Sequence, residues 1–287
     1  MTDKNVPMTP CISASKATDP HSGKNSADQV FEQYSRELQS PTNEGIVLTN
    51  LAADTYVETK DERLFNAVFR VATEPRHSDM VRFYAAHRVG EIFDPERHSS
   101  KIQDLISALK NKGDYEGVRK ALASSLGKIY TKTRQPEILN VIEEQMKAKR
   151  DNFKVRTECG QTLAVIYQES GEKSALDKLV CYIKTDCTKV DSKMEAEMFR
   201  WLVQFLREGY ESSHNQVFLD SLKELLDPNQ VEDTFIRQVA ITNLYVADGK
   251  SESTKQAFRD CHNNDPDWDV KAHAHNALFG NLKVSRG

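Results

Sequence analysis

The sequence lacks the cysteine pattern, the long apolar runs and the excess of one charge that mark several common classes of protein. Its 287 residues include five cysteines at irregular spacing and no C-x-x-C pair, so no disulfide framework is indicated. No apolar run approaches the roughly 20 residues needed to cross a bilayer, and the N-terminus lacks the apolar segment of a Sec-type signal peptide. We therefore expect a cytoplasmic protein, with export by a non-Sec route as the alternative.

The sequence also lacks a large excess of positive or negative charge. Lys and Arg number 39 and Asp and Glu number 43, which leaves a formal net charge of -4. A domain that binds nucleic acid usually shows a clear basic excess, because it must contact phosphates. The composition therefore argues against nucleic acid as a partner.

Glycine and proline are scarce, with 12 Gly and 9 Pro, and the long stretches free of both favour helix. The hydrophobic fraction of 38% is low for a thick-cored globule. It suits a thin solenoid, in which each helix buries one stripe and leaves the rest in water. Residues 1–25 have almost no large apolar side chains, so we expect them to form a disordered tail.

Three segments of the chain repeat at a fixed period. They begin at Val81, Val118 and Val155, so both steps are 37 residues (118 − 81 and 155 − 118). Each starts with Val-Arg, has Val or Leu at its ninth position and Ile at its twelfth, and ends on Phe or Tyr. Positions one, five, nine and twelve lie on one face of a helix, so each segment is predicted to be an amphipathic helix.

Small residues recur at two further positions of these helices. The first set is Ala86, Ala123 and Gly160, and the second is Gly90, Gly127 and Ala164. A Gly inside a helix costs up to about 1 kcal/mol relative to Ala. Its retention here predicts that neighbouring helices approach closely at these positions.

Each repeated helix is preceded by a second apolar stripe, which gives a helical hairpin as the repeat unit. The upstream residues Leu105, Ile142 and Leu179 are again 37 residues apart. Fainter copies of the second helix begin at Met194, Ile236 and Val270. We name the first helix of each hairpin A and the second B.

The B-helix pattern of Asp or Asn, then Val-Arg, two small residues and Leu-Gly-x-Ile resembles that of the HEAT-like (PBS-lyase-type) helical repeat family. The resemblance covers about residues 60–282 and implies an all-α fold, a right-handed α-solenoid (superhelix) of about six HEAT-like hairpins. We expect three parts: a tail over 1–25, N-terminal capping helices over 26–60, and the HEAT-like repeat domain over 61–287.

The resemblance also implies a polar ladder between stacked repeats. The expected ladder arginines are Arg82, Arg119, Arg156 and Arg237. Their expected partners are Asp79, Glu116 and Asp233. The fourth copy has Met194-Glu195 in place of Val-Arg, so a break in the ladder is expected there.

Signals for catalysis are absent from the sequence. It has no Gly-rich phosphate loop, no nucleophile elbow and no paired-carboxylate motif. Deoxyhypusine hydroxylase, which has a similar fold, binds di-iron through His-Glu dipeptides, and none of the eight His here precedes a Glu. His87 and Glu91 form a single i, i+4 pair that no other copy repeats. We expect no catalytic residue, no metal and no cofactor, while an active site assembled from distant repeats stays open.

Stacked hairpins place the B helices side by side along a concave surface, which suits a non-catalytic scaffold or adaptor that binds a protein partner. The candidate lining consists of residues beside the buried stripe: Phe83, His87, Lys120, Ser124, Thr157, Gln161, Arg200, Gln204 and Arg207. Phe83 is the most informative, since the matching residues Lys120 and Thr157 show that the repeat needs no aromatic there.

Two alternatives use the same surface. HEAT-like DNA glycosylases combine basic, aromatic and acidic residues, and this chain has Arg200-Trp201, Arg207 and Asp267-Trp268-Asp269. If the two tryptophans have only a structural role, we expect Trp201 to pack between the layers and Trp268 to cap the last hairpin. A continuous positive groove would favour nucleic acid, and a mixed groove would argue against it. The other alternative is a secreted bacterial effector that uses this surface on a host protein.

Overall fold

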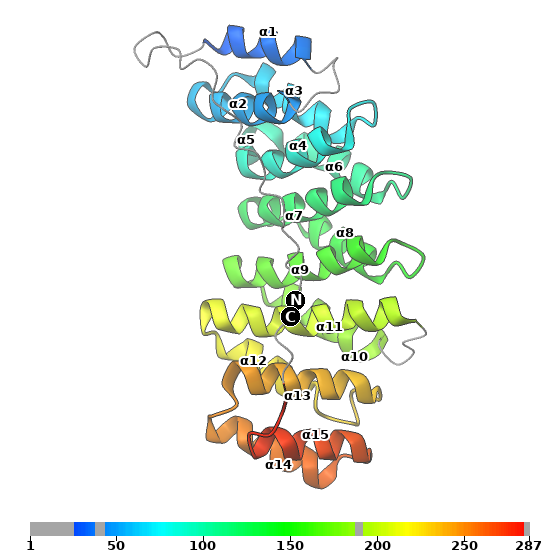
Figure 1. The fold of residues 1–287 in the computed structure, drawn as a ribbon. Coiled ribbons are helices and arrows are strands. Elements are labelled where there is room, and N and C mark those ends of the chain that lie inside the picture. Colours follow the sequence, from blue (N-terminus) through cyan, green and yellow to red (C-terminus); the bar gives the residue numbers. More distant parts are fainter. Residues whose placement is uncertain (1–25, 38–43, 187–191, 284–287) are drawn as a thin grey trace, which may run out of the picture.

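The computed structural model describes residues 26–37, 44–186 and 192–283, which form a stack of helical hairpins in two layers (Figure 1). The predicted tail, residues 1–25, lies outside the described residues. The B helices are α2 (Glu44–Thr59), α4 (Asp79–Ile92), α7 (Glu116–Thr133), α9 (Phe153–Ser170), α11 (Lys193–Ser213), α13 (Thr234–Asp248) and α15 (Trp268–Leu278).

The A helices form the other layer. They are α1 (Ala27–Glu37), α3 (Glu62–Thr73), α6 (Ile102–Lys110), α8 (Pro136–Lys147), α10 (Lys173–Asp186), α12 (Gln216–Glu224) and α14 (Glu252–Asn264). A short helix, α5 (Pro95–His98), and a 3-10 turn, η1 (Ser99–Lys101), lead into α6. The hairpin of α1 and α2 covers one end of the stack, where capping helices were expected (Figure 1).

The predicted fold class is confirmed: the chain is an all-α solenoid of helical hairpins, and its described residues contain no strand. Each B helix packs against the B helix before it and the one after it, from α2 to α15. Among the described helices, none has the length and apolar character that a membrane span requires.

Polar caps set where the B helices begin. The side chains of Ser78, Asn152 and Asp233 each accept a hydrogen bond from a backbone N–H in the first turn of α4, α9 and α13. At the other end, Arg134 and Gly171 adopt left-handed backbone conformations with φ of 56° and 69°. This conformation ends a helix and turns the chain tightly into the next A helix.

The repeated apolar residues meet in one continuous core. Val81, Val118 and Val155 are all buried, and the same holds for the Ile residues at the twelfth position of each copy. Equivalent positions thus lie at equivalent depth, which confirms the parallel register expected from the 37-residue period.

The two glycines of the second small-residue set lie where helices touch. A Cβ atom on Gly90 would be 2.7 Å from the Cα of Ser125, and one on Gly127 would be 2.5 Å from the Cγ2 of Thr162. The Ser125 hydroxyl also donates a 2.5 Å hydrogen bond to the Ala86 carbonyl across this contact. The predicted close approach of α4 to α7, and of α7 to α9, is confirmed.

Among the described residues, Arg82, Arg119 and Arg237 of the ladder each form a bidentate ion pair with an aspartate. The pairs join Arg82 to Asp114 (2.5 Å for both bonds), Arg119 to Asp151 (both 2.6 Å) and Arg237 to Asp265 (2.7 and 3.0 Å). In each pair, the aspartate lies in the A–B loop of the following hairpin. The ladder therefore links successive repeats.

The expected ladder partners need correction. Asp79 lies 3.9 Å from Arg82, farther than Asp114. Glu116 instead accepts hydrogen bonds from Lys154 and Asn152, and Asp233 caps α13. The expected partners were chosen at or near the start of the same B helix as the arginine. The observed partners, Asp114, Asp151 and Asp265, instead lie in the A–B loop of the next hairpin.

The remaining ladder arginine, Arg156, has partners in its own hairpin and in the next one. Arg156 of α9 donates to the Tyr182 hydroxyl at 2.5 Å and to the Met146 carbonyl at 3.1 Å. Its nearest described carboxylate is that of Glu195 in α11, at 3.7 Å. Asp191 has the same place before α11 that Asp151 has before α9, and it lies outside the described residues, so the break expected at the fourth copy stays a prediction.

Candidate functional site: the exposed face of the B helices

All nine candidate surface residues lie on four consecutive B helices, and none of them is fully buried. We call the exposed side of the B helices the B face. The candidates are Phe83 and His87 on α4, Lys120 and Ser124 on α7, Thr157 and Gln161 on α9, and Arg200, Gln204 and Arg207 on α11.

A hollow of about 320 Å³ opens on the B face where α7, α9 and α11 meet. We call it the B-face hollow. Its lining residues are Lys120 of α7, Phe153, Lys154, Thr157, Glu158 and Gln161 of α9, and Trp201, Phe205 and Glu208 of α11. The structure thus brings together three of the nine candidates, Lys120, Thr157 and Gln161, and adds residues that the sequence had not singled out.

The residues of α11 that meet α9 differ from those at the preceding joints. Ser125 in α7 and Thr162 in α9 each lie against a glycine of the preceding B helix. In α11, Leu202 lies against a glycine of α9, Gly160. The neighbouring Trp201 is 41% exposed and lines the hollow.

Aromatic side chains form the apolar part of the hollow. The ring centroids of Trp201 and Phe205 lie 6.5 Å apart, and Phe205 is almost completely buried beneath the surface. Phe153, at the start of α9, is partly exposed on the opposite wall. A rigid aromatic surface at the centre of a polar rim is the usual composition of an interaction hot spot.

Charged groups surround these rings. Burial raises the pKa of the Glu158 carboxyl, and the Lys120 ammonium, 3.4 Å away, opposes that rise. Lys154 contacts Glu116 at 2.5 Å, and this hydrogen bond raises the pKa of Lys154. Glu208 accepts a 2.6 Å hydrogen bond from the Gln204 amide. The rim of the hollow therefore contains both signs of charge.

The candidates on α4 form a separate cluster. Phe83 meets His87 edge to face at 4.6 Å and Tyr84 at 5.4 Å between ring centroids. Burial and the charge of Lys128 lower the pKa of His87, and Glu91 partly offsets this. Glu91 accepts hydrogen bonds from Arg88 at 2.6 Å and from Lys128 at 3.1 Å.

No group of three or more potential metal ligands occurs among the residues described. This survey covered His, Cys, Asp and Glu side chains.

The three candidates on α11 lie beside the hollow. The Arg200 guanidinium lies over the Phe235 ring of α13, 5.6 Å from its centroid. Arg207 lies 3.5 Å from Glu211 and 4.0 Å from Glu208. These contacts orient both arginines along the B face.

Cations on the B face are paired with carboxylates. Arg88 contacts Asp54 and Glu91, and Lys128 also contacts Glu91. The other pairs are Lys120 with Glu158, Lys154 with Glu116, Arg200 with Glu197 and Arg207 with Glu211. The charges described on this face are therefore mixed in sign.

The tryptophans of the DNA-glycosylase alternative lie apart. Trp201 is on α11 and Trp268 begins α15, with α13 between them (Figure 1). Asp267 caps α15 by accepting hydrogen bonds from the backbone of Asp269 and Val270. The interpretation that Trp201 packs between the layers is wrong, because Trp201 is 41% exposed and lines the B-face hollow.

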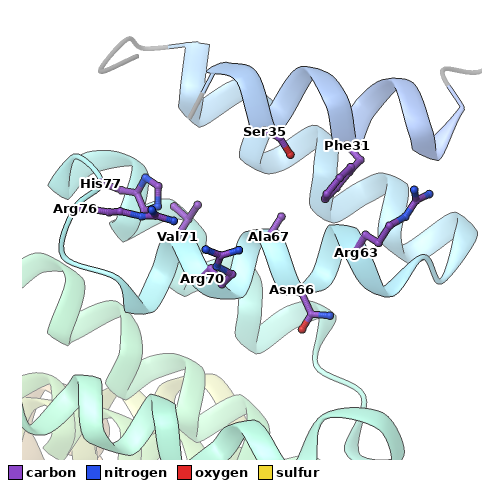
Figure 2. Close-up of a pocket in the computed structure, with 9 residues that line it drawn as sticks. All are labelled: Phe31, Ser35, Arg63, Asn66, Ala67, Arg70, Val71, Arg76 and His77. Atoms are coloured by element: carbon purple, nitrogen blue, oxygen red, sulfur yellow. The ribbon is translucent and has the colours of Figure 1, made fainter. Parts of the chain in front are cut away.

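A second hollow, of about 550 Å³, lies in the other layer between α1 and α3. Figure 2 shows Phe31 and Ser35 facing it from α1, opposite Ala67, Arg70 and Val71. The remaining lining residues are Arg63, Asn66, Arg76 and His77.

The arginines of this second hollow already have carboxylate partners. Arg63 contacts Asp28 and Asp61 at 2.6 Å, and Arg70 and Arg76 contact Glu74 at 3.0 and 2.7 Å. The sequence did not predict this hollow, because its walls come from two A helices without a shared motif.

No family model and no curated protein matches the sequence. The designed armadillo repeat protein YIII(Dq)4CqI is 15% identical with a TM-score of 0.32, covering 75% of this chain and 98% of its own. The design YIII(Dq.V1)4CPAF in complex with peptide (KR)4 is 13% identical with a TM-score of 0.34, covering 82% and 98%. Human deoxyhypusine hydroxylase in complex with glycerol is 14% identical with a TM-score of 0.31, covering 79% and 98%.

These identities and scores are too low to assign a family or a function. The helical-repeat part of the resemblance seen in the sequence is confirmed by the stacked hairpins themselves. Membership of the HEAT-like family stays a prediction.

Proposed function

We propose that this protein is a non-catalytic scaffold or adaptor that binds a protein partner on the B face, with the B-face hollow at the centre of the contact. The observation that supports this most is the outward position of Trp201 in a hollow with a polar rim. Tryptophan is the residue type most enriched among interface hot spots.

Other apolar side chains extend the surface along the stack. Met80 of α4, Val165 of α9 and Val246 of α13 are exposed large hydrophobic residues on B helices. They stand between paired charges, so the surface combines apolar and polar groups as protein–protein interfaces do. An extended face of this kind suits a partner segment that contacts several repeats.

The ion pairs between cations and carboxylates on the B face make the nucleic-acid alternative less favourable. Binding to phosphates draws on clustered cations, and those of this face are compensated by carboxylates. A cytoplasmic location stays a prediction, as does export as an effector.

Site-specific photocrosslinking in the full-length chain tests the proposal. A benzophenone amino acid replaces Ser124, Gln161 or Gln204 on the B face, and Gln103 or Asp177 on A helices as controls. We expect a discrete protein adduct from the B-face positions in extracts of the native host, identified by mass spectrometry, and little from the controls. Trp201→Ala should reduce the adduct by about tenfold or more, as for a hot-spot residue.

Trp268→Ala is the matched control, because Trp268 is 77% exposed and lies outside the hollow. Adducts only from the A-helix positions, or adducts unaffected by Trp201→Ala, would contradict the proposal. Adducts that nuclease digestion removes would instead favour the nucleic-acid alternative.

A further inference from the structure

We propose that the B-face hollow binds an arginine side chain of the partner protein, held between the Trp201 indole and the carboxylates of Glu158 and Glu208. This inference rests on the proposed function and names the chemistry of the partner. The side chain that enters the hollow is positively charged. The peptide experiment below distinguishes it from a negatively charged or purely apolar side chain.

The size of the hollow fits a side chain. Its volume of about 320 Å³ is near the lower end of the range for small-molecule pockets, roughly 300–1,000 Å³. An anchor residue of an extended segment fits there, while the rest of the segment contacts the polar rim.

The aromatic wall favours a cation. A guanidinium within about 6 Å of an aromatic centroid is attracted by the negative charge of the ring face, and tryptophan gives the strongest such attraction. The neighbouring residue on the same helix shows this contact within the chain, since Arg200 lies over Phe235 at 5.6 Å. The exposed Trp201 ring offers a similar surface to an arginine from outside.

The balance of charge around the hollow points the same way. The lining has two lysines, Lys120 and Lys154, and two carboxylates, those of Glu158 and Glu208. Lys154 is paired with Glu116, outside the lining, so Glu208 has no lysine of the hollow as its partner. The closest described cation to Glu208 is Arg207, at 4.0 Å, which is too long for a direct hydrogen bond.

The lysines of the hollow are poorly placed to receive an anion. Lys154 is held by Glu116 at 2.5 Å, and Lys120 contacts Glu158 at 3.4 Å. An incoming carboxylate or phosphate would have to displace these acids and would meet Glu208 as well. An incoming guanidinium finds acceptors on both walls, because a carboxylate has room for several hydrogen bonds.

Peptide binding to the full-length chain tests this inference. The chain has two tryptophans, so Trp268→Phe leaves the Trp201 indole N–H as a single signal in the 15N NMR spectrum. The probes are blocked Gly/Ser peptides with one central Arg, Lys, citrulline or Glu. Citrulline keeps the shape of arginine without its charge.

We expect the Arg peptide to shift the Trp201 indole signal and to bind about tenfold more tightly than the citrulline peptide, with Lys between them. Glu158→Gln should bring the Arg-to-citrulline ratio close to one. Glu169→Gln is the matched control: this glutamate is exposed on the same helix, lies outside the hollow, and should leave the ratio unchanged.

Equal binding of the Arg and citrulline peptides, tighter binding of the Glu peptide, or no indole shift at about 10 mM peptide would overturn the inference. If Trp201→Ala still abolishes the B-face crosslinks in that case, the proposed function stands and only the arginine anchor is wrong. If the crosslinks do not depend on Trp201, the proposed function itself fails.

Discussion

Arg119 and Asp151 illustrate how single residues hold neighbouring repeats together. Both side chains are almost fully buried, at 1% and 2% exposure, and they form two hydrogen bonds to each other. Arg119 also donates to the Leu109 carbonyl, within its own hairpin. The guanidinium therefore connects two hairpins, and its charge depends on the aspartate from the next one.

Asp151→Asn should destabilise the protein by about 3 kcal/mol, because it leaves a buried guanidinium without its countercharge. The free energy of unfolding in urea measures this. Asp177→Asn, at an exposed position on α10, should change it by less than about 0.5 kcal/mol. Equal effects of the two substitutions would show that the ladder adds nothing to stability.

Acid should weaken the ladder. Burial would raise the pKa of Asp114 and Asp151, but the hydrogen bonds from Arg82 and Arg119 outweigh it and hold both pKa values below the ordinary 3.8. A carboxyl with a lowered pKa gives stability that is present above its unfolded pKa and is lost as the pH falls through the folded one. The free energy of unfolding should therefore fall below about pH 4.

Measurements between about pH 6 and pH 2 check this dependence. Asp151→Asn should flatten it, since one of the two aspartates no longer titrates. A variant with the slope of the original chain would contradict the assignment to the ladder.

At the scale of the helix, close packing depends on the absence of a side chain. Gly90→Ala would place a Cβ 2.7 Å from the Cα of Ser125, so α4 and α7 must separate. Overpacking costs about 1–3 kcal/mol, and the better helix propensity of Ala returns up to about 1 kcal/mol. We expect a net loss of about 1 kcal/mol in the free energy of unfolding.

Gly113→Ala is the comparison for this substitution, since a Cβ there meets only the Asn111 side chain at an ordinary 3.5 Å. It should leave the free energy of unfolding nearly unchanged. Increased stability in Gly90→Ala would mean that the helices separate at little cost.

The B helices could be predicted from the sequence because their signal is local. The 37-residue period gives the register of Val81, Val118 and Val155, and the small residues give the contact positions. The ladder aspartates were not assigned, although Asp114 and Asp151 are one 37-residue period apart (151 − 114). The period shows that the two aspartates are equivalent, but not which arginine each one contacts across 32 residues.

The candidate site was predicted in part for a related reason. Spacing identifies side chains that point outward, such as Lys120, Thr157 and Gln161, but not the shape of the surface between helices. No local signal separates an exposed indole at Trp201 from one packed between the layers, so its place in the hollow could not be predicted.

For the whole molecule, the B-face hollow lies where three successive B helices, α7, α9 and α11, meet. A partner bound there would contact three repeats at once. The proposed binding region therefore depends on the stacking of the hairpins and not on one hairpin alone.

The direction of the ladder has a consequence for biosynthesis. Each of the three ladder pairs described joins an arginine to an aspartate that lies later in the chain. During translation, the arginine of each pair therefore leaves the ribosome before the aspartate that neutralises its charge. A nascent hairpin must wait for roughly 30 more residues, a few seconds of translation, before its charge can be buried without penalty.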